Sequence, residues 1–149
     1  MSAATMTQIG LLQRLRDVRL RSAQAALATA RARSAEAARA QDEAAEEARA
    51  AERARLAKRD ALFADPGEAE RRLALLEIAT VDQAAAAERE QDAMLCLTSR
   101  LVEEGKSRAV VLSADARVTA LATRAAEVRR TLNARDEERA AIEAEEARR

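Results

Sequence analysis

Apolar and polar positions repeat with helical spacing along nearly the whole chain. In the second half, seven apolar residues alternate between spacings of three and four, which is the a and d pattern of a coiled-coil seam. They are Val111, Ala114, Val118, Leu121, Ala125, Val128 and Leu132. The first half has shorter runs of the same kind: Leu11, Leu15 and Val18, then the alanines 37, 40, 44, 48 and 51. Each half therefore predicts a long helix with one narrow apolar stripe.

The segment LFADPGEAERR, residues 62–72, interrupts this pattern and contains the only proline of the chain. Asp65 has the properties of an N-cap, and Pro66 then occupies the first helical position, where its missing N–H is not needed. Glu68 follows at the spacing of a capping box. The sequence predicts a first helix over about residues 7–64, a turn over about 65–67 and a second helix over about 66–148.

Folding the chain back at Asp65–Pro66 brings matching residues of the two halves together. Leu56 then lies opposite Leu75, the alanines at 44 and 45 lie opposite those at 86 and 87, and Leu20 lies opposite Val111. We therefore predict an all-α fold of one domain, residues 1–149, in which two long helices form an antiparallel coiled-coil hairpin. One continuous helix pairing with a second copy is the alternative, but it gives the cap at Asp65 no role.

Two clusters hold more apolar residues than one stripe can bury. Leu73, Leu75, Leu76, Ile78 and Val81 follow the turn, and Met94, Leu95, Cys96, Leu97, Leu101 and Val102 follow further on. They are either partly buried in the coiled coil or in a self-association face, or they form docking surface for another protein.

The second predicted helix is longer than the first and overhangs it. The first helix runs out opposite about residue 124, which leaves the last 20 to 25 residues of the chain without an intramolecular partner. Val128, Leu132 and Ile142 continue the seam in this overhang, with Arg135 and Arg139 at the positions between them. The overhang either frays or is received by something outside the chain.

Composition excludes several function classes. The 26 basic and 26 acidic residues cancel, and only 1% of the chain is aromatic, so neither phosphate neutralisation nor base stacking is expected and nucleic acid is not a predicted partner. The chain has no histidine, no phosphate-binding glycine loop and no paired-cysteine metal spacing, so no catalytic, cofactor or metal site is expected. Cys96 has no histidine to activate it and is interpreted as a small apolar residue that is buried or half-buried.

No run near Met1 has the length and apolarity of a signal segment or a membrane span, which favours a cytoplasmic location without direct membrane insertion. An amphipathic helix lying on a membrane surface is a weaker alternative. Such helices usually carry aromatic residues at the interface, and Phe63 is the only aromatic residue here.

The segment LLQRLRDVRLRSAQAALATARARSAEA, residues 11–37, resembles the opening of the FliJ/YscO stalk proteins of flagellar and virulence type III secretion. The chain length, the single mid-chain turn and the charged C-terminal stretch NARDEERAAIEAEEARR are also similar to that family. The resemblance covers nearly the whole chain and is one of architecture and composition.

The resemblance implies a non-enzymatic bacterial stalk protein, peripheral to a membrane-embedded export apparatus. Its partners would be the hexameric secretion ATPase and the export gate, with secretion chaperones as a further class. The open end would enter the ATPase ring, through Leu11, Leu15, Val128, Leu132, Arg135, Arg139 and Ile142. The turn end would face the gate, through Leu73, Leu76 and Ile78. A generic coiled-coil scaffold or chaperone-like hairpin unrelated to secretion is the alternative.

Overall fold

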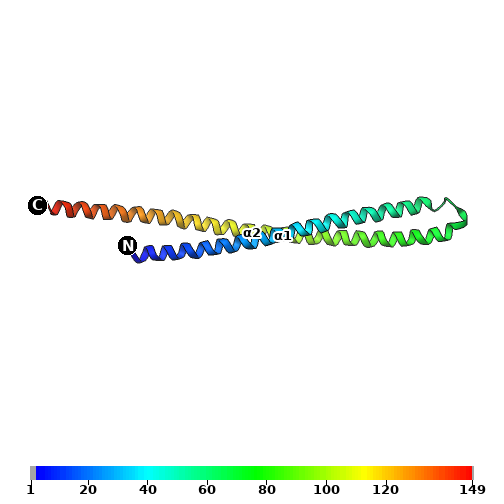
Figure 1. The fold of residues 1–149 in the computed structure, drawn as a ribbon, viewed down its shortest axis with the longest axis horizontal. Coiled ribbons are helices and arrows are strands. Elements are labelled where there is room, and N and C mark those ends of the chain that lie inside the picture. Colours follow the sequence, from blue (N-terminus) through cyan, green and yellow to red (C-terminus); the bar gives the residue numbers. More distant parts are fainter. Residues whose placement is uncertain (1–2, 149) are drawn as a thin grey trace. The chain divides into compact units, whose positions relative to one another are not determined.

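The structure is a computed structural model that describes residues 3–148, with side chains from Met6 onward. Helix α1 spans Ala3–Ala61, the short 3-10 helix η1 spans Pro66–Glu68, and helix α2 spans Ala69–Glu146 (Figure 1). Alanine, leucine, glutamate and arginine dominate both long helices, and these residues have the highest helix propensities. α1 and α2 pack against each other in antiparallel directions, so the predicted all-α hairpin is confirmed.

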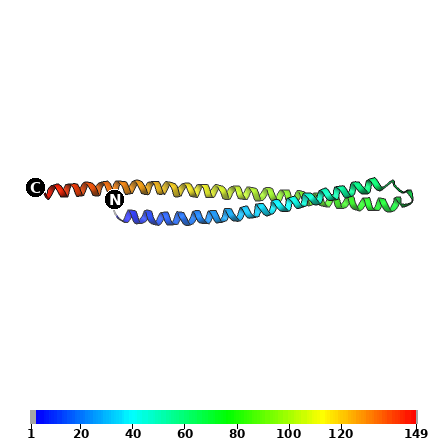
Figure 2. The same ribbon diagram turned by 45° about the horizontal axis from the view of Figure 1, so that its top comes forward.

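The turn lies around Asp65 and Pro66, as the sequence predicts, but it begins earlier than predicted. α1 ends at Ala61, before the predicted residue 64, and residues 62–65 lead into η1. Asp65 has an extended backbone, and its carboxylate accepts a hydrogen bond of 3.0 Å from the Gly67 amide, as an N-cap does. Figure 2 shows the turn joining the two helices. The cap therefore stops one helix and starts the next.

The capping box predicted for Glu68 is not formed. Its carboxylate points along the chain and pairs with Arg72 at 3.4 Å and with Arg71 at 3.9 Å. Arg72 also donates from Nη1 to the Ala61 carbonyl at 2.6 Å, and this carbonyl at the end of α1 accepts from the Ala64 amide as well, at 3.3 Å. Arg72 thus ties the beginning of α2 to the end of α1, and Glu68 holds the guanidinium in place.

The positions of α2 that are shielded from solvent recur at alternating spacings of four and three from Arg72 to Leu132 without interruption. On α1 the same repeat runs from Ile9 to Arg55. These two series are the coiled-coil seam, and they include all seven residues predicted between Val111 and Leu132. A two-helix hairpin buries only this stripe, so most other side chains remain exposed.

The hairpin divides into two units. The turn unit, Ala28–Gly105, packs through small residues, because its buried apolar side chains are Ala37 and Ala86 of the seam and Ala45 next to the seam residue Ala44. The predicted alanine stripe is correct except at Ala40, which is exposed while Gln41 takes the seam position. Ser34 is also buried, and its Oγ donates to Glu104 Oε2 at 2.6 Å across the seam. This buried hydroxyl is thus paired between the helices, whereas the buried Nε of Arg55 in the same unit has no hydrogen-bond partner.

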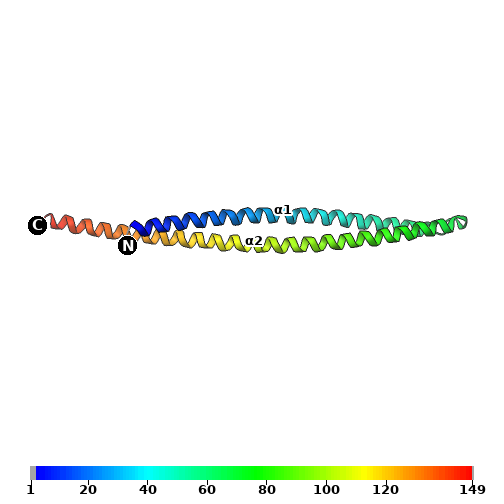
Figure 3. The ribbon, with the colours of Figure 1, turned by 90° about the horizontal axis from the view of Figure 1, so that it is seen from below.

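The terminal unit joins the described residues up to Leu27 with those from Lys106 onward. Its most buried side chains are Leu27, Ala125 and Val128. Folding back at Asp65–Pro66 would place Arg16 opposite Asp115, whereas its Nη1 donates to the Arg117 carbonyl at 2.7 Å. This contact lies within one turn of the predicted register. Within this unit α2 extends beyond the first residues of α1 (Figure 3).

Replacing Ala86 by leucine should destabilise the hairpin, because Ala86 is only 2% exposed and lies where the helices approach closely. Overpacking of this kind costs about 1–3 kcal/mol in the free energy of unfolding, measurable by thermal and denaturant melts followed by circular dichroism. The neighbouring Ala85→Leu is the control, because Ala85 is exposed and leucine is nearly as good a helix former as alanine. Equal free energies of unfolding for the two variants would contradict close packing of the helices at Ala86.

Candidate partner-binding surfaces

The first turns of α1 carry a second apolar stripe that faces away from α2. Leu11, Leu15 and Val18 are spaced four and three apart, as in a coiled-coil seam, and are 59%, 46% and 60% exposed. Leu12 lies beside them and is 46% exposed. Arg14, Arg19 and Arg21 flank this outward stripe on both sides. A helix or ridge with apolar residues and acidic flanks would complement it in both shape and charge.

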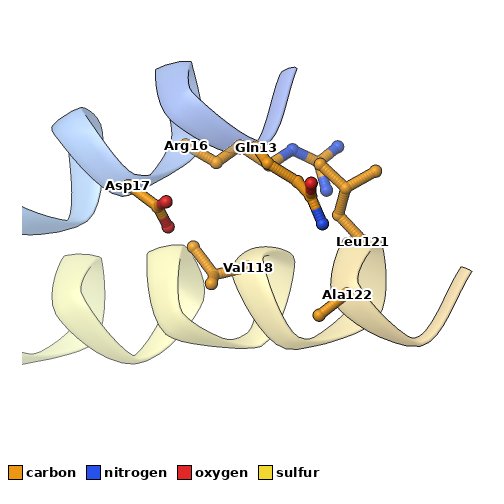
Figure 4. Close-up of a pocket in the computed structure, with 6 residues that line it drawn as sticks. All are labelled: Gln13, Arg16, Asp17, Val118, Leu121 and Ala122. Carbon is orange, nitrogen blue, oxygen red and sulfur yellow. The ribbon is translucent and has the colours of Figure 1, made fainter. Parts of the chain in front are cut away.

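This arrangement corrects the sequence prediction that Leu11, Leu15 and Val18 form the intramolecular seam. The seam residues of this segment are Ile9, Gln13, Arg16 and Leu20. Gln13, Arg16 and Asp17 of α1 face Val118, Leu121 and Ala122 of α2 across a shallow cleft of about 330 Å³ (Figure 4). Arg16 Nη1 donates to the Arg117 carbonyl, which engages one of the five guanidinium N–H groups, while the aliphatic stem lies along the seam.

The overhang of α2 is shorter than the sequence predicts. Val128 is only 6% exposed and Leu132 is half-buried, so both belong to the intramolecular seam and neither is available to a partner in this hairpin. The first arm reaches them because α1 begins at Ala3 and not near residue 7. The overhang, residues 133–146 of α2, starts after Leu132.

The overhang keeps the seam spacing but has little apolar surface of its own. Arg135, Arg139 and Ile142 occupy the seam positions and are exposed, with Ile142 at 51%. Six acidic residues lie among them: Asp136, Glu137, Glu138, Glu143, Glu145 and Glu146. A helix with a single large apolar residue cannot bury a continuous apolar stripe. A partner surface that contacts the overhang would therefore be largely polar.

The turn end has two separate apolar surfaces. Phe63 is 86% exposed and, with Leu62, Ala69, Glu70 and Leu73, lines an open apolar cleft at the turn. Phe63 is missing from the predicted site, although its position beside the helix break as the only aromatic residue is a sequence signal. An exposed aromatic ring next to Leu73 is typical of an interface anchor.

The three predicted gate-side residues lie in three different environments. Leu73 is 47% exposed beside Phe63, and Ile78 is 58% exposed near Val81, at 68%, further along α2. Leu76 is a seam residue and is half-buried against α1. The prediction is therefore corrected for Leu76, whereas Leu73 and Ile78 are free to contact a partner.

Among the residues that the structure describes, no group of three or more His, Cys, Asp or Glu side chains could hold a metal ion. Cys96 is exposed on α2, so the expectation that it is buried or half-buried is wrong. No helix within residues 3–148 combines the length and the apolarity needed to cross a membrane.

No family model matches the chain, and comparisons with curated proteins and with solved structures give no significant match.

Replacing Leu76 by serine should lower the free energy of unfolding by about 2 kcal/mol, because a packed leucine is lost from the seam and a hydroxyl takes its place. Ile78→Ser, on the exposed face, should change it by no more than about 0.5 kcal/mol beyond the small difference in helix propensity. Chemical denaturation followed by circular dichroism measures both values. A larger loss for Ile78→Ser than for Leu76→Ser would contradict the assignment of the seam.

Proposed function

We propose that the protein is a non-enzymatic coiled-coil stalk of a bacterial type III secretion ATPase complex. The terminal unit would insert into the hexameric ATPase ring, and the turn unit would contact the export gate. The resemblance to the FliJ/YscO proteins motivates this proposal, and the observation that supports it most directly is the structure of the terminal unit. This unit combines three features: a packed coiled coil, an outward apolar stripe, and an overhang of α2 that does not pack on α1.

The terminal unit suits a protein-lined hole in three respects. The outward stripe of Leu11, Leu15 and Val18 offers apolar contact on the face opposite α2. The arginines beside it favour a lining that carries acidic residues. The overhang presents Arg135 and Arg139 where a second apolar coil would require apolar residues, which favours a polar lining.

The turn unit supplies a separate surface for the second partner. Phe63 and Leu73 form an exposed apolar pair at the turn, and Ile78 and Val81 expose a further pair on α2. None of these residues belongs to the seam, so a partner could bind them without opening the hairpin. A stalk needs such a division, because it must hold its fold while it contacts two other proteins.

The triple substitution of Leu11, Leu15 and Val18 by serine should abolish most of the stimulation of ATP hydrolysis by the cognate ATPase. Each lost apolar anchor weakens an interface by about 1–2 kcal/mol, so binding should fall by at least about tenfold. The matched control is the triple substitution of Met94, Leu95 and Leu101 by serine, since these residues of α2 are 52%, 62% and 52% exposed and lie in the turn unit. Circular dichroism should show both variants folded. Full stimulation by the triple variant would exclude the outward stripe as a ring contact.

The overhang should exchange its amide hydrogens rapidly in the free protein, because most helical stability comes from packing that residues 133–146 lack. Adding the cognate ATPase should protect these amides, as hydrogen–deuterium exchange with mass spectrometry would measure. Deleting residues 133–149 should remove stimulation and leave the melting temperature unchanged, since Leu132 is the last seam residue packed on α1. If neither the full chain nor any variant associates with a hexameric ATPase, the protein is a scaffold unrelated to secretion.

The gate contact is tested separately by Phe63→Ser combined with Leu73→Ser. This variant should lose binding to the cytoplasmic part of the export gate and keep full stimulation of the ATPase, because the changed residues lie only in the turn unit. Loss of both activities together would mean that the two surfaces do not act separately.

A further inference from the structure

The face of α2 that lies away from α1 near the turn carries an apolar stripe of its own. Ala74, Ile78 and Val81 are spaced four and three apart and are exposed, with Ile78 at 58% and Val81 at 68%. The seam of this segment passes through Leu76 and Ala79 on the other side of the helix. We call Ala74, Ile78 and Val81 the turn-side stripe. A partner can bind it without any change in the hairpin.

Acidic residues flank the turn-side stripe. Glu77 comes directly before Ile78, and Asp82 comes directly after Val81. In the heptad of the stripe these are the g and e positions, whose charges determine partner choice and orientation in coiled coils. Glu70 takes the g position one heptad earlier. A complementary helix would therefore carry an apolar stripe with basic residues at the same two positions.

The outward stripe of α1 meets this description position by position. Its residues precede those of the turn-side stripe by 63 positions, or nine whole heptads: Leu11, Leu15 and Val18 against Ala74, Ile78 and Val81. Arg14 occupies the position that corresponds to Glu77, and Arg19 occupies the position that corresponds to Asp82. The same chain therefore contains an apolar stripe with basic flanks and its acidic counterpart.

We propose that the outward stripe of one copy binds the turn-side stripe of a second copy, with the two helices parallel. Equivalent positions of parallel helices face each other, so Leu15 packs on Ile78 of the second copy and Val18 packs on its Val81. These four side chains are between 46% and 68% exposed in the single chain, so the contact removes apolar surface from water.

The charged flanks determine the direction of the two helices. In a parallel coiled coil, a residue at g pairs with the residue at e in the next heptad of the other helix. This rule brings Arg14 to Asp82 and Arg19 to Glu77, which gives two pairs of opposite charge. An antiparallel contact centred on the same stripes would place Arg19 beside Leu75 and keep only one pair of opposite charge. The parallel arrangement is therefore favoured.

The partner is a second copy because this contact cannot form within one chain. α1 and α2 of one chain are antiparallel, whereas the charged flanks match best between parallel helices. Within the part of the chain that the structure describes, Arg14, Arg19, Glu77 and Asp82 take part in no ion pair, so their charges can meet those of another molecule. Every copy carries both surfaces, so identical chains can associate without another protein.

The contact is short, and its length sets its strength. One heptad beyond Arg14, Arg21 would meet Arg89 of the second copy, and this pair of like charges ends the contact after about three turns. Such a contact falls well short of the ~800 Å² per partner that a standard interface buries, so it is weak and reversible. It does not rest on the proposed stalk function, although an ATPase ring that takes the outward stripe would displace the second copy.

Sedimentation equilibrium of the full chain alone should show an average mass that rises with protein concentration. Arg19→Glu should raise the dissociation constant at least about tenfold, because it replaces one pair of opposite charge by two carboxylates that repel each other. Arg33→Glu is the control, since Arg33 is an exposed arginine of the same helix outside the contact. Both variants should keep the melting temperature of the parent. A monomer at every concentration, or equal weakening by the two variants, would overturn the proposal.

Two double variants test which charges meet. Arg19→Glu combined with Glu77→Arg in one chain should recover association, because the pair is restored with its charges exchanged. Arg19→Glu combined with Asp82→Arg has the same net charge but should not recover it, because both pairs then consist of like charges. Equal association of the two double variants would exclude the proposed pairing.

Cysteine crosslinking tests the parallel direction. In a Cys96→Ser background, a chain with Val18→Cys mixed with a chain with Val81→Cys should form an intermolecular disulfide on mild oxidation, because facing Cα atoms of closely packed helices lie at about the distance that a disulfide spans. Val18→Cys mixed with Ile78→Cys should crosslink at least about tenfold more slowly, since Ile78 faces Val18 only in an antiparallel contact. Equal rates, or faster crosslinking in the second mixture, would exclude the parallel arrangement.

Discussion

A hairpin of two helices has room for one interface, and the choice of that interface fixes the exposure of every other residue. In this protein the seam is narrow because much of it is alanine, most clearly in the turn unit, where Ala37, Ala45 and Ala86 are buried. The α2 series keeps one heptad phase from Arg72 to Leu132, and no residue between them shifts it. This phase excludes three groups of exposed apolar residues: the outward stripe on α1, Met94, Leu95, Leu101 and Val102 on α2, and Phe63 and Leu73 at the turn.

The polar residues of the seam explain how so small an apolar interface selects one pairing. Ser34 and Glu104 meet across the turn unit, and Arg16 reaches the Arg117 carbonyl in the terminal unit. A shift of the helices by one heptad would separate both of these pairs. Alanines therefore permit the close approach, and polar pairs define its register.

The sequence was sufficient for the fold and for the cap at Asp65, because both depend on local signals: helix propensity, one proline and a heptad repeat around Val118. It was insufficient for the first turns of α1, where Leu11, Leu15 and Val18 have the same spacing as a true seam. Two series of residues with heptad spacing occur there, the outward stripe and the seam. Only the seam series continues in phase with the alanine stripe further along α1, and it is therefore the one that faces α2. That decision depends on pairing with α2, so no local pattern in α1 contains it. Phe63 was missed for the opposite reason, since a single residue forms no pattern.

The separation of seam from exposed surface has a consequence for function. In a globular domain a large apolar residue usually supports the core, so changing it alters stability and binding together. Here Leu15 and Leu20 lie five residues apart on α1, yet only Leu20 contributes to the seam. Exposed leucines can therefore be selected for a partner without cost to the hairpin, while the seam tolerates small and polar residues as long as its phase is kept. This division lets a chain of such simple composition hold its own fold and still present several distinct surfaces.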